Sequence, residues 1–567
     1  MHKYYIVGRK SLIKMQIYRY LLILIAVLGL ASCSKEPGPN GGNGGNGGDE
    51  PIKEWTISGY VKGNDGKALE GVVVSDGLNC VKTDKEGRYY LPADLSKAYY
   101  VIVSTPSNYS APVVDGHACY WKWLKDSSKD SNGKYSVDFT LNKISNPERF
   151  SLFIFADPQP RTTGRSNGMD AIAYHSLECC DDMYRDMKEY AATRKGYPVY
   201  GIGLGDIVHQ NTDLLSRYRA GMATTGVTTY NVIGNHDQGH TMNLTNEEAC
   251  EAYEAAMGPA NYSFNLGNMH FLMLDNMLSQ QGSYSDECAT GLTDEIWEWV
   301  KNDLKYVSTD TPLMVCAHSP MMRMESGSNR SGAHLGELRN LLSKYKKAYV
   351  WAGHTHTTFN YVDKNDPVIE THTVSRVTGA LWTNEYLGSN GTPRGYVAFE
   401  YDNGSISWKF KPLYYQTSEY VGYQNVGDPD YTWRDWDYTN GKAVLKTTGK
   451  DLDDKYQMQI FPPGTYGDKY LYVNVFLWDE LWNTPRFTMD GSASVMKRVT
   501  EKDYCYSYSD WFITAFYNTN IKYGSDFVPD KNNNSSMFRV YVDAEHGSGT
   551  VSVKDRFGNE HKSTITW

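Results

Sequence analysis

The chain has 567 residues, more than one ordinary hydrophobic core holds, so it is expected to divide into several domains. Hydrophobic residues make up 40% of it and charged residues 22%, a composition typical of globular proteins. Acidic residues outnumber basic ones by 66 to 56, which leaves no electrostatic reason to bind nucleic acid. We therefore expect a multidomain globular protein without a nucleic-acid partner.

The first 32 residues have the features of an export signal. Five basic residues and no acidic ones precede the apolar run 21–30, and the small residues Ala31 and Ser32 follow that run. The apolar run is too short to span a bilayer. We therefore predict a signal peptide over residues 1–32, which is removed before Cys33.

Cys33 ends the segment 30–33, Leu-Ala-Ser-Cys, which resembles the lipobox of bacterial lipoproteins. The resemblance implies that Cys33 is acylated and that the exported protein is anchored to the outer membrane through this lipid. Residues 34–36, Ser-Lys-Glu, resemble the charged tract that directs some lipoproteins to the cell surface. Ordinary cleavage that leaves Cys33 as a free thiol is the alternative.

A flexible linker and a small β domain are predicted next. The linker spans residues 33–50, because the glycine-rich run 38–48 cannot build a core. Residues 51–147 then show short alternating strands separated by turn signals, such as the segments 56–61 and 69–75. This pattern resembles the transthyretin-like β-sandwich of exported bacterial proteins. We interpret it as a spacer domain, with a ligand-binding module as the alternative.

Residues 148–405 alternate strand-like and helix-like segments, which predicts a layered α/β domain. Helical length and periodicity mark residues 171–195 and 293–307, and Thr293 is a plausible N-cap of the second helix. Five short apolar runs have the character of buried strands. They are residues 152–155, 199–204, 227–233, 313–316 and 348–351.

Each of these five runs is followed at once by residue types that bind metals. In chain order they are Asp157 with Gln159, Asp206, Asn235 with His236 and Asp237, His318, and His354 with His356. Because the carboxyl ends of strands in α/β domains line one crevice, we expect these side chains to converge. Carboxylate, amide and imidazole groups without a thiolate suit Mn²⁺, Fe or Zn²⁺. The sequence therefore predicts a hydrolytic centre with two divalent metal ions.

The order of these motifs closely resembles the calcineurin-like metallophosphoesterase family, whose signature is D-x-H, G-D, G-N-H-[DE], a lone His and G-H-x-H. The match covers roughly residues 150–400 of this chain. It implies a central β-sandwich with helices on both faces, here flanked by the N-terminal β domain and by a second, β-rich domain over residues 406–567. It also implies hydrolysis of a phosphate ester or diphosphate bond by a hydroxide held between the two metals.

Carried over residue by residue, the resemblance implies two metal sites that share one carboxylate, since two close cations need an anion between them. The ligands of the first metal would be Asp157, Gln159, Asp206 and His356. The ligands of the second would be Asp206, Asn235, His318 and His354. Outside both sets, His236 would protonate the leaving oxygen, and Asp237 would orient His236 and favour its charged form.

Gln159 departs from the family pattern, which has His at this position. An amide carbonyl is a weaker ligand than imidazole, so the first site is expected to bind its metal more loosely and to favour Mn²⁺ or Mg²⁺. A similar Asp-x-Gln occurs in the branch of the family that resembles manganese-dependent ADP-ribose/CDP-alcohol diphosphatases. Cleavage of a monoester, a diester or a diphosphate all remain open.

Further polar residues have weaker signals. A role in binding phosphate and a structural role are both open for three of them, Arg161, His209 and His240. Glu370 and His372 share a face under strand alternation, so we predict a structural pair. Structural roles are also predicted for His175 and His334.

Residues 406–567 are strand-like and contain seven of the fourteen tryptophans, which predicts a β-rich domain. Aromatic residues in a β domain most often form its core, although exposed ones can stack on sugar rings. The favoured reading of the whole chain is an enzyme that hydrolyses a phosphorylated small molecule or glycan. The alternative is a glycan- or ligand-binding surface protein in which Gln159 marks a metal site that has been lost.

Overall fold

A computed structural model describes twelve segments of the chain. They are residues 54–161, 170–239, 244–279, 289–322, 332–363, 367–379, 392–413, 432–437, 444–447, 454–464, 468–499 and 536–567. The predicted signal peptide, Cys33 and the glycine-rich linker lie outside these segments. No helix within them combines the length and apolar character that crossing a membrane takes. Residues from Lys53 to Trp567 form one compact unit.

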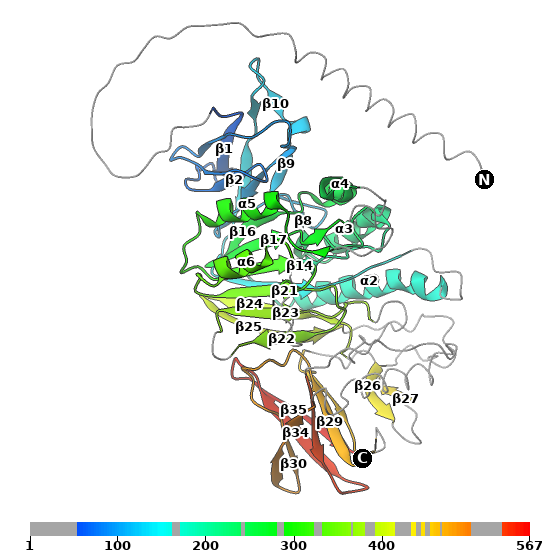
Figure 1. Cartoon of the computed structure of the whole chain (residues 1–567). Coiled ribbons are helices and arrows are strands. Elements are labelled where there is room, and N and C mark those ends of the chain that lie inside the picture. The colour runs from blue at the N-terminus through cyan, green and yellow to red at the C-terminus, as the bar shows by residue number, and fades with distance from the viewer. Residues whose placement is uncertain are drawn as a thin grey trace, which may run out of the picture. The chain divides into compact units, whose positions relative to one another are not determined.

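The N-terminal region is a small domain of two β-sheets (Figure 1). The strands are β1 (Ile57–Gly63), β2 (Val73–Ser75), β3 (Cys80–Lys82), β4 (Arg88–Leu91), β5 (Tyr100–Ser104), β6 (Tyr109–Ser110), β9 (Trp121–Trp123), β10 (Ser128–Lys129), β11 (Tyr135–Ser136) and β12 (Phe139–Lys143). Every second side chain of β1 is buried, as a half-exposed sheet requires. Val61, Val74 and Phe139 meet in one core, which confirms the predicted β domain.

The central domain is built on two larger sheets. The first has the order β25-β24-β13-β14-β15-β8-β7 and the second β16-β17-β20-β21-β23-β22. The strands of the first are β7 (Val113–Val114), β8 (His117–Ala118), β13 (Arg149–Phe155), β14 (Val199–Leu204), β15 (Thr228–Val232), β24 (Gly395–Asp402) and β25 (Ser405–Pro412). The strands of the second are β16 (Tyr262–Leu266), β17 (Met269–Leu274), β20 (Leu313–Ala317), β21 (Ala348–Ala352), β22 (Phe359–Val362) and β23 (Ile369–Thr373). All five predicted buried strands are present.

Helices cover the outer faces of the two sheets. They are α2 (Asp170–Ala191), α3 (Leu215–Ala223), α4 (Asn246–Met257), α5 (Asp294–Leu304) and α6 (Leu335–Leu342). Side chains such as Ile202 and Trp351 fill the layer between the sheets. Phe155 packs outward with the cluster of α2, α3 and α4, and Val315 with that of α5 and α6. The fold is therefore the predicted β-sandwich with helices on both faces, and Thr293 caps α5 as expected.

The sheets extend beyond the predicted domain boundaries. β24 and β25 form a hairpin through Asn403-Gly404, so the boundary predicted at residue 405 falls inside the first sheet. At the other edge, β8 pairs with β15, so two short strands of the N-terminal region also join this sheet. A strand-like stretch of sequence does not reveal which sheet it enters, because the hydrogen-bond partners are distant in the chain.

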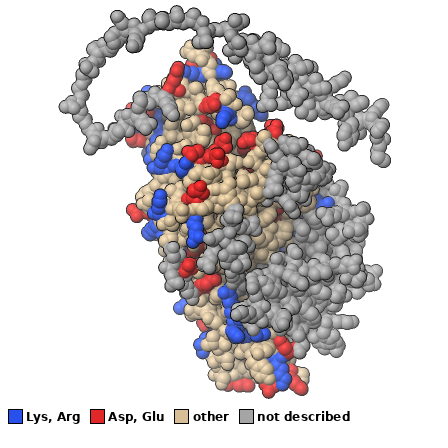
Figure 2. Space-filling view, viewed as in Figure 1, with Lys and Arg blue, Asp and Glu red and all other residues tan. Residues whose placement is uncertain are grey.

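The C-terminal region is β-rich, as predicted. Two four-stranded sheets contain β28 (Met458–Phe461), β29 (Tyr470–Val475), β30 (Arg486–Met489), β31 (Ser492–Val495), β32 (Lys497–Arg498), β33 (Met537–Tyr541), β34 (Ser548–Lys554) and β35 (Glu560–Thr566). β26 (Thr432–Asp437) and β27 (Val444–Thr447) form a separate hairpin. Trp478 and Trp482 are core residues, as the aromatic pattern indicated. Among the residues drawn in Figure 2, acidic and basic side chains alternate over the visible face.

Glu370 and His372 form a buried cluster where the C-terminal domain meets the second sheet. His372 Nε2 lies 3.2 Å from Glu370 Oε2, and both side chains are fully buried, so the predicted structural pair is present. Arg556 of the C-terminal domain donates to both oxygens of Glu370, at 2.7 and 2.6 Å. It also donates to Asp479, at 3.1 Å. The C-terminal domain is thereby bound to β23. The neighbouring strand β21 is followed by two predicted ligands, His354 and His356.

Candidate metal centre

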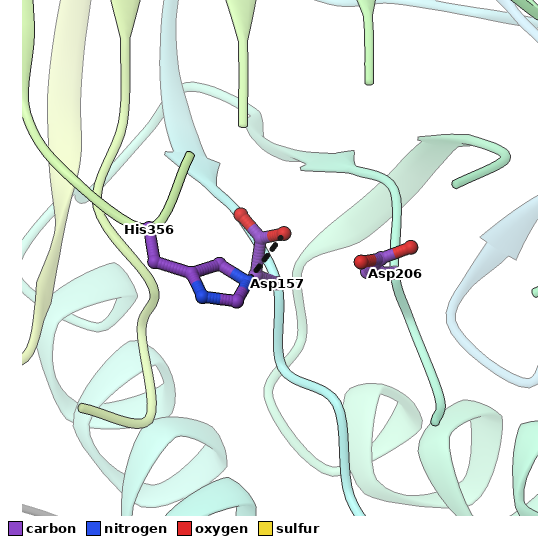
Figure 3. Close-up of side chains that lie close together, drawn as sticks. All are labelled: Asp157, Asp206 and His356. Carbon is purple, nitrogen blue, oxygen red and sulfur yellow. Dashed lines mark ion pairs between the residues drawn. The ribbon is translucent and has the colours of Figure 1, made fainter. Parts of the chain in front are cut away.

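The predicted residues converge although they come from both sheets. Asp157 follows β13 and Asp206 follows β14 in the first sheet, whereas His356 follows β21 in the second. Ligand atoms of these three residues all lie within 4.8 Å of one another. The His356 ring points toward the Asp157 carboxylate, with Nε2 at 3.5 Å from Oδ1, and Asp206 lies across from them (Figure 3). Two carboxylates and an imidazole thus face one small space.

A second set of atoms has the spacing that a single cation imposes on its ligands. Asn235 Oδ1 lies 3.1 Å from both His318 Nε2 and His354 Nδ1. His318 Nε2 also lies 3.2 Å from His354 Nδ1 and 3.2 Å from Asp206 Oδ1. Metal–ligand bonds of about 2.1 Å place neighbouring ligand atoms roughly 3.0–3.4 Å apart in tetrahedral or octahedral geometry. These four residues therefore fit one divalent ion.

The orientation of His318 supports this fit. Its Nδ1 lies 2.7 Å from the Leu204 carbonyl, which can only accept, so Nδ1 carries the proton. In the neutral ring, Nε2 then offers its lone pair to the space shared with Asn235 and His354. His354 Nδ1 lies 3.2 Å from this Nε2, so one cation could accept a lone pair from each ring when both are neutral.

Gln159 contacts the shared carboxylate. Its Nε2 donates to Asp206 Oδ2 at 2.7 Å. This contact leaves the carbonyl oxygen of the same amide available to a metal, because an amide is both donor and acceptor. Asp206 is therefore contacted on Oδ2 by Gln159 and on Oδ1 by His318, which places it between the two ligand sets. The role of Gln159 as a ligand stays a prediction.

The backbone at the ligands is unusual. Five predicted ligands have positive φ angles, a conformation that side chains other than Gly rarely adopt. The angles are 52° at Asp157, 42° at Gln159, 50° at Asp206, 68° at His354 and 58° at His356. Sharp turns after the strands direct these side chains into one space.

The glycines of the motifs are needed for close packing. A Cβ atom at Gly234 would lie 2.2 Å from Asp206 Oδ1, and one at Gly353 would lie 2.6 Å from Asp157 Oδ2. Both distances are far below van der Waals contact. The glycines before Asn235 and His354 therefore let one ligand loop pack against the carboxylate of another.

The charges of the pocket favour a bound cation. Burial opposes a charge on His318, yet the carboxylates of Asp206 and Asp157 raise the pKa of its ring to about 9. Burial also opposes a charge on Asp206, but His318 and His236 hold the pKa of this carboxyl well below its usual range. Negative charge in the pocket thus stabilises a positive charge against burial. A metal ion satisfies the same demand.

His236 and Asp237 have separate positions. His236 Nε2 lies 3.9 Å from Asp206 Oδ2, and its side chain is 15% exposed. Among the described residues, the partners of the Asp237 carboxylate are the backbone N–H groups of Ile207, Val208 and Gly234 at 2.9–3.1 Å, and not the His236 ring. Burial and the charge of Asp206 raise the pKa of Asp237 to about 7. The contacts give Asp237 a structural position that ties two ligand loops together, whereas its predicted action on His236 stays a prediction.

The histidines with weaker sequence signals have different positions in the structure. His209 packs against His236, with ring centroids 4.2 Å apart, and so lies beside the centre. Burial lowers its pKa, and the nearby charges of His236 and Arg161 lower it further. His334 instead pairs with Asp294 at 2.7 Å, in keeping with a structural role. His240 and the side chain of His175 lie outside the described residues.

Three family models match the chain in succession. They are the N terminal of calcineurin-like phosphoesterase over residues 55–144, calcineurin-like phosphoesterase over residues 175–358, and the C terminal of calcineurin-like phosphoesterase over residues 371–561. No curated protein matches the chain.

Solved structures show distant similarity. Purple acid phosphatase PPD1 from yellow lupin (Lupinus luteus) seeds is 15% identical, with a TM-score of 0.32, over 60% of this chain and 66% of that one. PhoD is 11% identical, with a TM-score of 0.32, over 71% of this chain and 83% of that one. The 5'-nucleotidase from Candida albicans is 11% identical, with a TM-score of 0.29, over 47% of this chain and 52% of that one.

Proposed function

The chain belongs to the calcineurin-like phosphoesterase family, with both of that family's flanking domains, and from this premise we propose that it is a metal-dependent hydrolase of phosphate ester or diphosphate bonds. The observation that carries the proposal is the four-atom cluster of Asp206, Asn235, His318 and His354, at separations of 3.1–3.2 Å. A second cluster shares Asp206 with the first, since ligand atoms of Asp157, Asp206 and His356 all lie within 4.8 Å of one another.

Two divalent ions fit these residues, with Mn²⁺, Fe or Zn²⁺ as the candidates. The first would be held by Asp157, Gln159, Asp206 and His356, and the second by Asp206, Asn235, His318 and His354. When bound, such ions supply positive charge to the phosphoryl oxygens and make an attacking water more acidic.

The protein's own contribution is to position groups around the reacting phosphate. Asp206 reaches both ligand sets and keeps them together. His236 is partly exposed beside this carboxylate, which stabilises a protonated imidazole there. In the proposed reaction it gives a proton to the leaving oxygen.

The proposed substrates are phosphorylated small molecules or glycans. Gln159, by its resemblance to the diphosphatase branch, favours a diphosphate among them. The alternative is a non-catalytic binding protein in which the metal site has been lost. Against it, the six predicted ligands other than Gln159 all belong to the two clusters.

Metal dependence tests the proposal. Protein dialysed against a chelator is expected to be inactive and to regain hydrolysis of an aryl phosphate monoester, diester or diphosphate when Mn²⁺ is added. The reason is that imidazoles and carboxylates alone cannot neutralise the charge of the transferring phosphoryl group. A panel of nucleotides, phosphorylated metabolites and glycans assayed with Mn²⁺, Fe²⁺ and Zn²⁺ should then rank the substrates. Silence across this whole panel would favour the binding protein.

We also propose that the protein is a lipoprotein anchored to the bacterial outer membrane through Cys33. The support is the leader at residues 1–32, the lipobox-like segment 30–33 and the glycine-rich tether. A Cys33→Ala variant is expected to leave the membrane fraction of the producing bacterium. Recovery of this variant with the membranes, to the same extent as the parent, would count against the anchor.

A further inference from the structure

We infer that Arg376 is a positioning residue that holds the backbone of the first metal site; the inference rests on the proposed function, in which that site binds a metal. Arg376 follows β23 and is 1% exposed. Its Nε donates to the carbonyl of Asp157 at 3.1 Å, and its Nη2 donates to the carbonyl of Gln159 at 3.3 Å. Thr378 donates to the carbonyl between them, that of Pro158, at 2.9 Å. One short segment thus binds three successive carbonyls of the loop that carries two predicted ligands.

This loop needs such partners because it has left the β ladder. Asp157 and Gln159 have positive φ angles and are fully buried, so water cannot serve their carbonyls. Their N–H groups bind the neighbouring ligand loop, since Asp157 donates to Gly205 O at 3.2 Å and Gln159 donates to Asp206 O at 3.0 Å. The donors of the loop are therefore held by one neighbour and its acceptors by Arg376 and Thr378.

The guanidinium is suited to this position and an ammonium is not. Its N–H groups have a fixed planar spacing and bind two separate acceptors at once, whereas a lysine side chain delivers a point charge. Arg376 is itself fixed by the backbone, because the N–H of Val377 donates to Ala156 O at 3.0 Å. The hydrogen bonds from Arg376 and Thr378 therefore fix the backbone of residues 157–159, which follow β13.

The hydrogen bonds that Arg376 donates go to residues of the first ligand set. Their acceptors are the backbone carbonyls of Asp157 and Gln159. The second set is held differently, since His318 is oriented by the Leu204 carbonyl and the ligand atoms of Asn235 and His354 face one another. Loss of the guanidinium is therefore expected to weaken the first metal site while the second keeps its ion.

Mn²⁺ titration of the whole chain by calorimetry, together with EPR of the loaded protein, tests this inference. The parent is expected to bind two Mn²⁺ ions and to give the spectrum of a coupled pair. Arg376→Met, which keeps the length of the apolar stem but removes the donors, should bind one of the two ions at least tenfold more weakly. Its spectrum, at a Mn²⁺ concentration that fills the tighter site, should become that of an isolated ion.

Arg394→Met is the matched control. Arg394 is also fully buried and donates at 3.1 Å to Asp182 on α2. Its loss also removes a fully buried guanidinium, here one that pairs with a carboxylate outside the ligand sets, so thermal stability should fall while both Mn²⁺ affinities stay at the values of the parent. Arg376→Lys should behave like Arg376→Met in the titration, because it keeps the positive charge but lacks the planar pair of N–H donors.

The outcomes separate the inference from the proposed function. Two ions bound by Arg376→Met with the affinities of the parent would overturn the inference and leave the phosphoesterase proposal standing. A parent that binds no Mn²⁺, Fe²⁺ or Zn²⁺ would overturn both. If Arg376→Met does not fold, the titration of Arg376→Lys tests the inference instead. Mn²⁺ affinities in Arg376→Lys that equal those of the parent would also overturn the positioning role of Arg376.

Discussion

An Asn235→Ala variant is expected to keep its fold and to lose at least about 100-fold in metal-dependent hydrolysis, because even residues one shell away from a metal affect affinity or activity by 10–100-fold. Asn235 Oδ1 faces the nitrogens of His318 and His354, each at 3.1 Å. Its removal leaves the second ion one ligand short and leaves the two nitrogens without the oxygen between them. The measurement is kcat/KM at saturating Mn²⁺, with a Mn²⁺ titration of the same preparation.

Asn302→Ala provides the control for this variant. Asn302 Nδ2 donates to the Leu78 carbonyl at 2.8 Å, between the central and N-terminal domains. Its loss removes this hydrogen bond and an exposed one that Lys305 donates to Asn302 Oδ1, and it touches no predicted ligand, so hydrolysis should match the parent. Equal rates for the Asn235→Ala variant and the parent at the same Mn²⁺ concentration would contradict the assignment of Asn235.

Arg556→Met is expected to lower the free energy of unfolding by about 3 kcal/mol, the cost of leaving one partner of a buried ion pair uncompensated. Glu370 is fully buried, and Arg556, which is 11% exposed, binds both of its oxygens. His372 and Lys347 stay beside Glu370, which places the expected loss at the low end of such values. Calorimetric unfolding should show the loss in the transition of the C-terminal and central domains.

The same ion pair predicts a pH dependence. Burial opposes the charge of Glu370, but His372 and Arg556 hold its pKa well below the usual range. A carboxyl whose pKa is lower in the folded state contributes stability above its unfolded pKa of about 4.3 and loses that contribution as the pH falls below it. The difference in the free energy of unfolding between the parent and Arg556→Met should therefore be largest near neutral pH and should shrink as the pH falls below about 4.3.

An exposed pair controls for the removal of a charge alone. Lys469 and Asp543 form an ion pair with side chains 62% and 66% exposed. Because solvent screens such a pair, Lys469→Met should unfold at the temperature of the parent. Similar stabilities for the Arg556→Met and Lys469→Met variants would mean that the Glu370 cluster does not hold the two domains together.

The sequence predicted those parts of the centre that are encoded locally. Each ligand follows an apolar strand directly, so strand and ligand are visible together in one short segment. The glycine before a ligand is visible for the same reason, although its cause, the missing space for a Cβ beside Asp206, appears only in three dimensions. Glu370 and His372 were recognisable as a pair because strand alternation places them on one face.

What the sequence could not predict depends on distant contacts. Arg556 lies 186 residues from Glu370, and nothing near either residue indicates the other. Arg376 lies beyond the last motif and resembles any other arginine until the carbonyls of Asp157 and Gln159 are seen beside it. The contact of the Gln159 amide with the Asp206 carboxylate also joins residues 47 positions apart, and neither motif indicates it.

The division of the ligands between two sheets has a consequence for the order of events in folding. Asp157, Asp206 and Asn235 stand on one layer, and His318 and His354 on the other, so neither layer alone surrounds an ion. Both predicted ligand sets are therefore complete only once the two sheets have packed together. An ion bound there would stabilise the packed pair of sheets relative to either sheet alone.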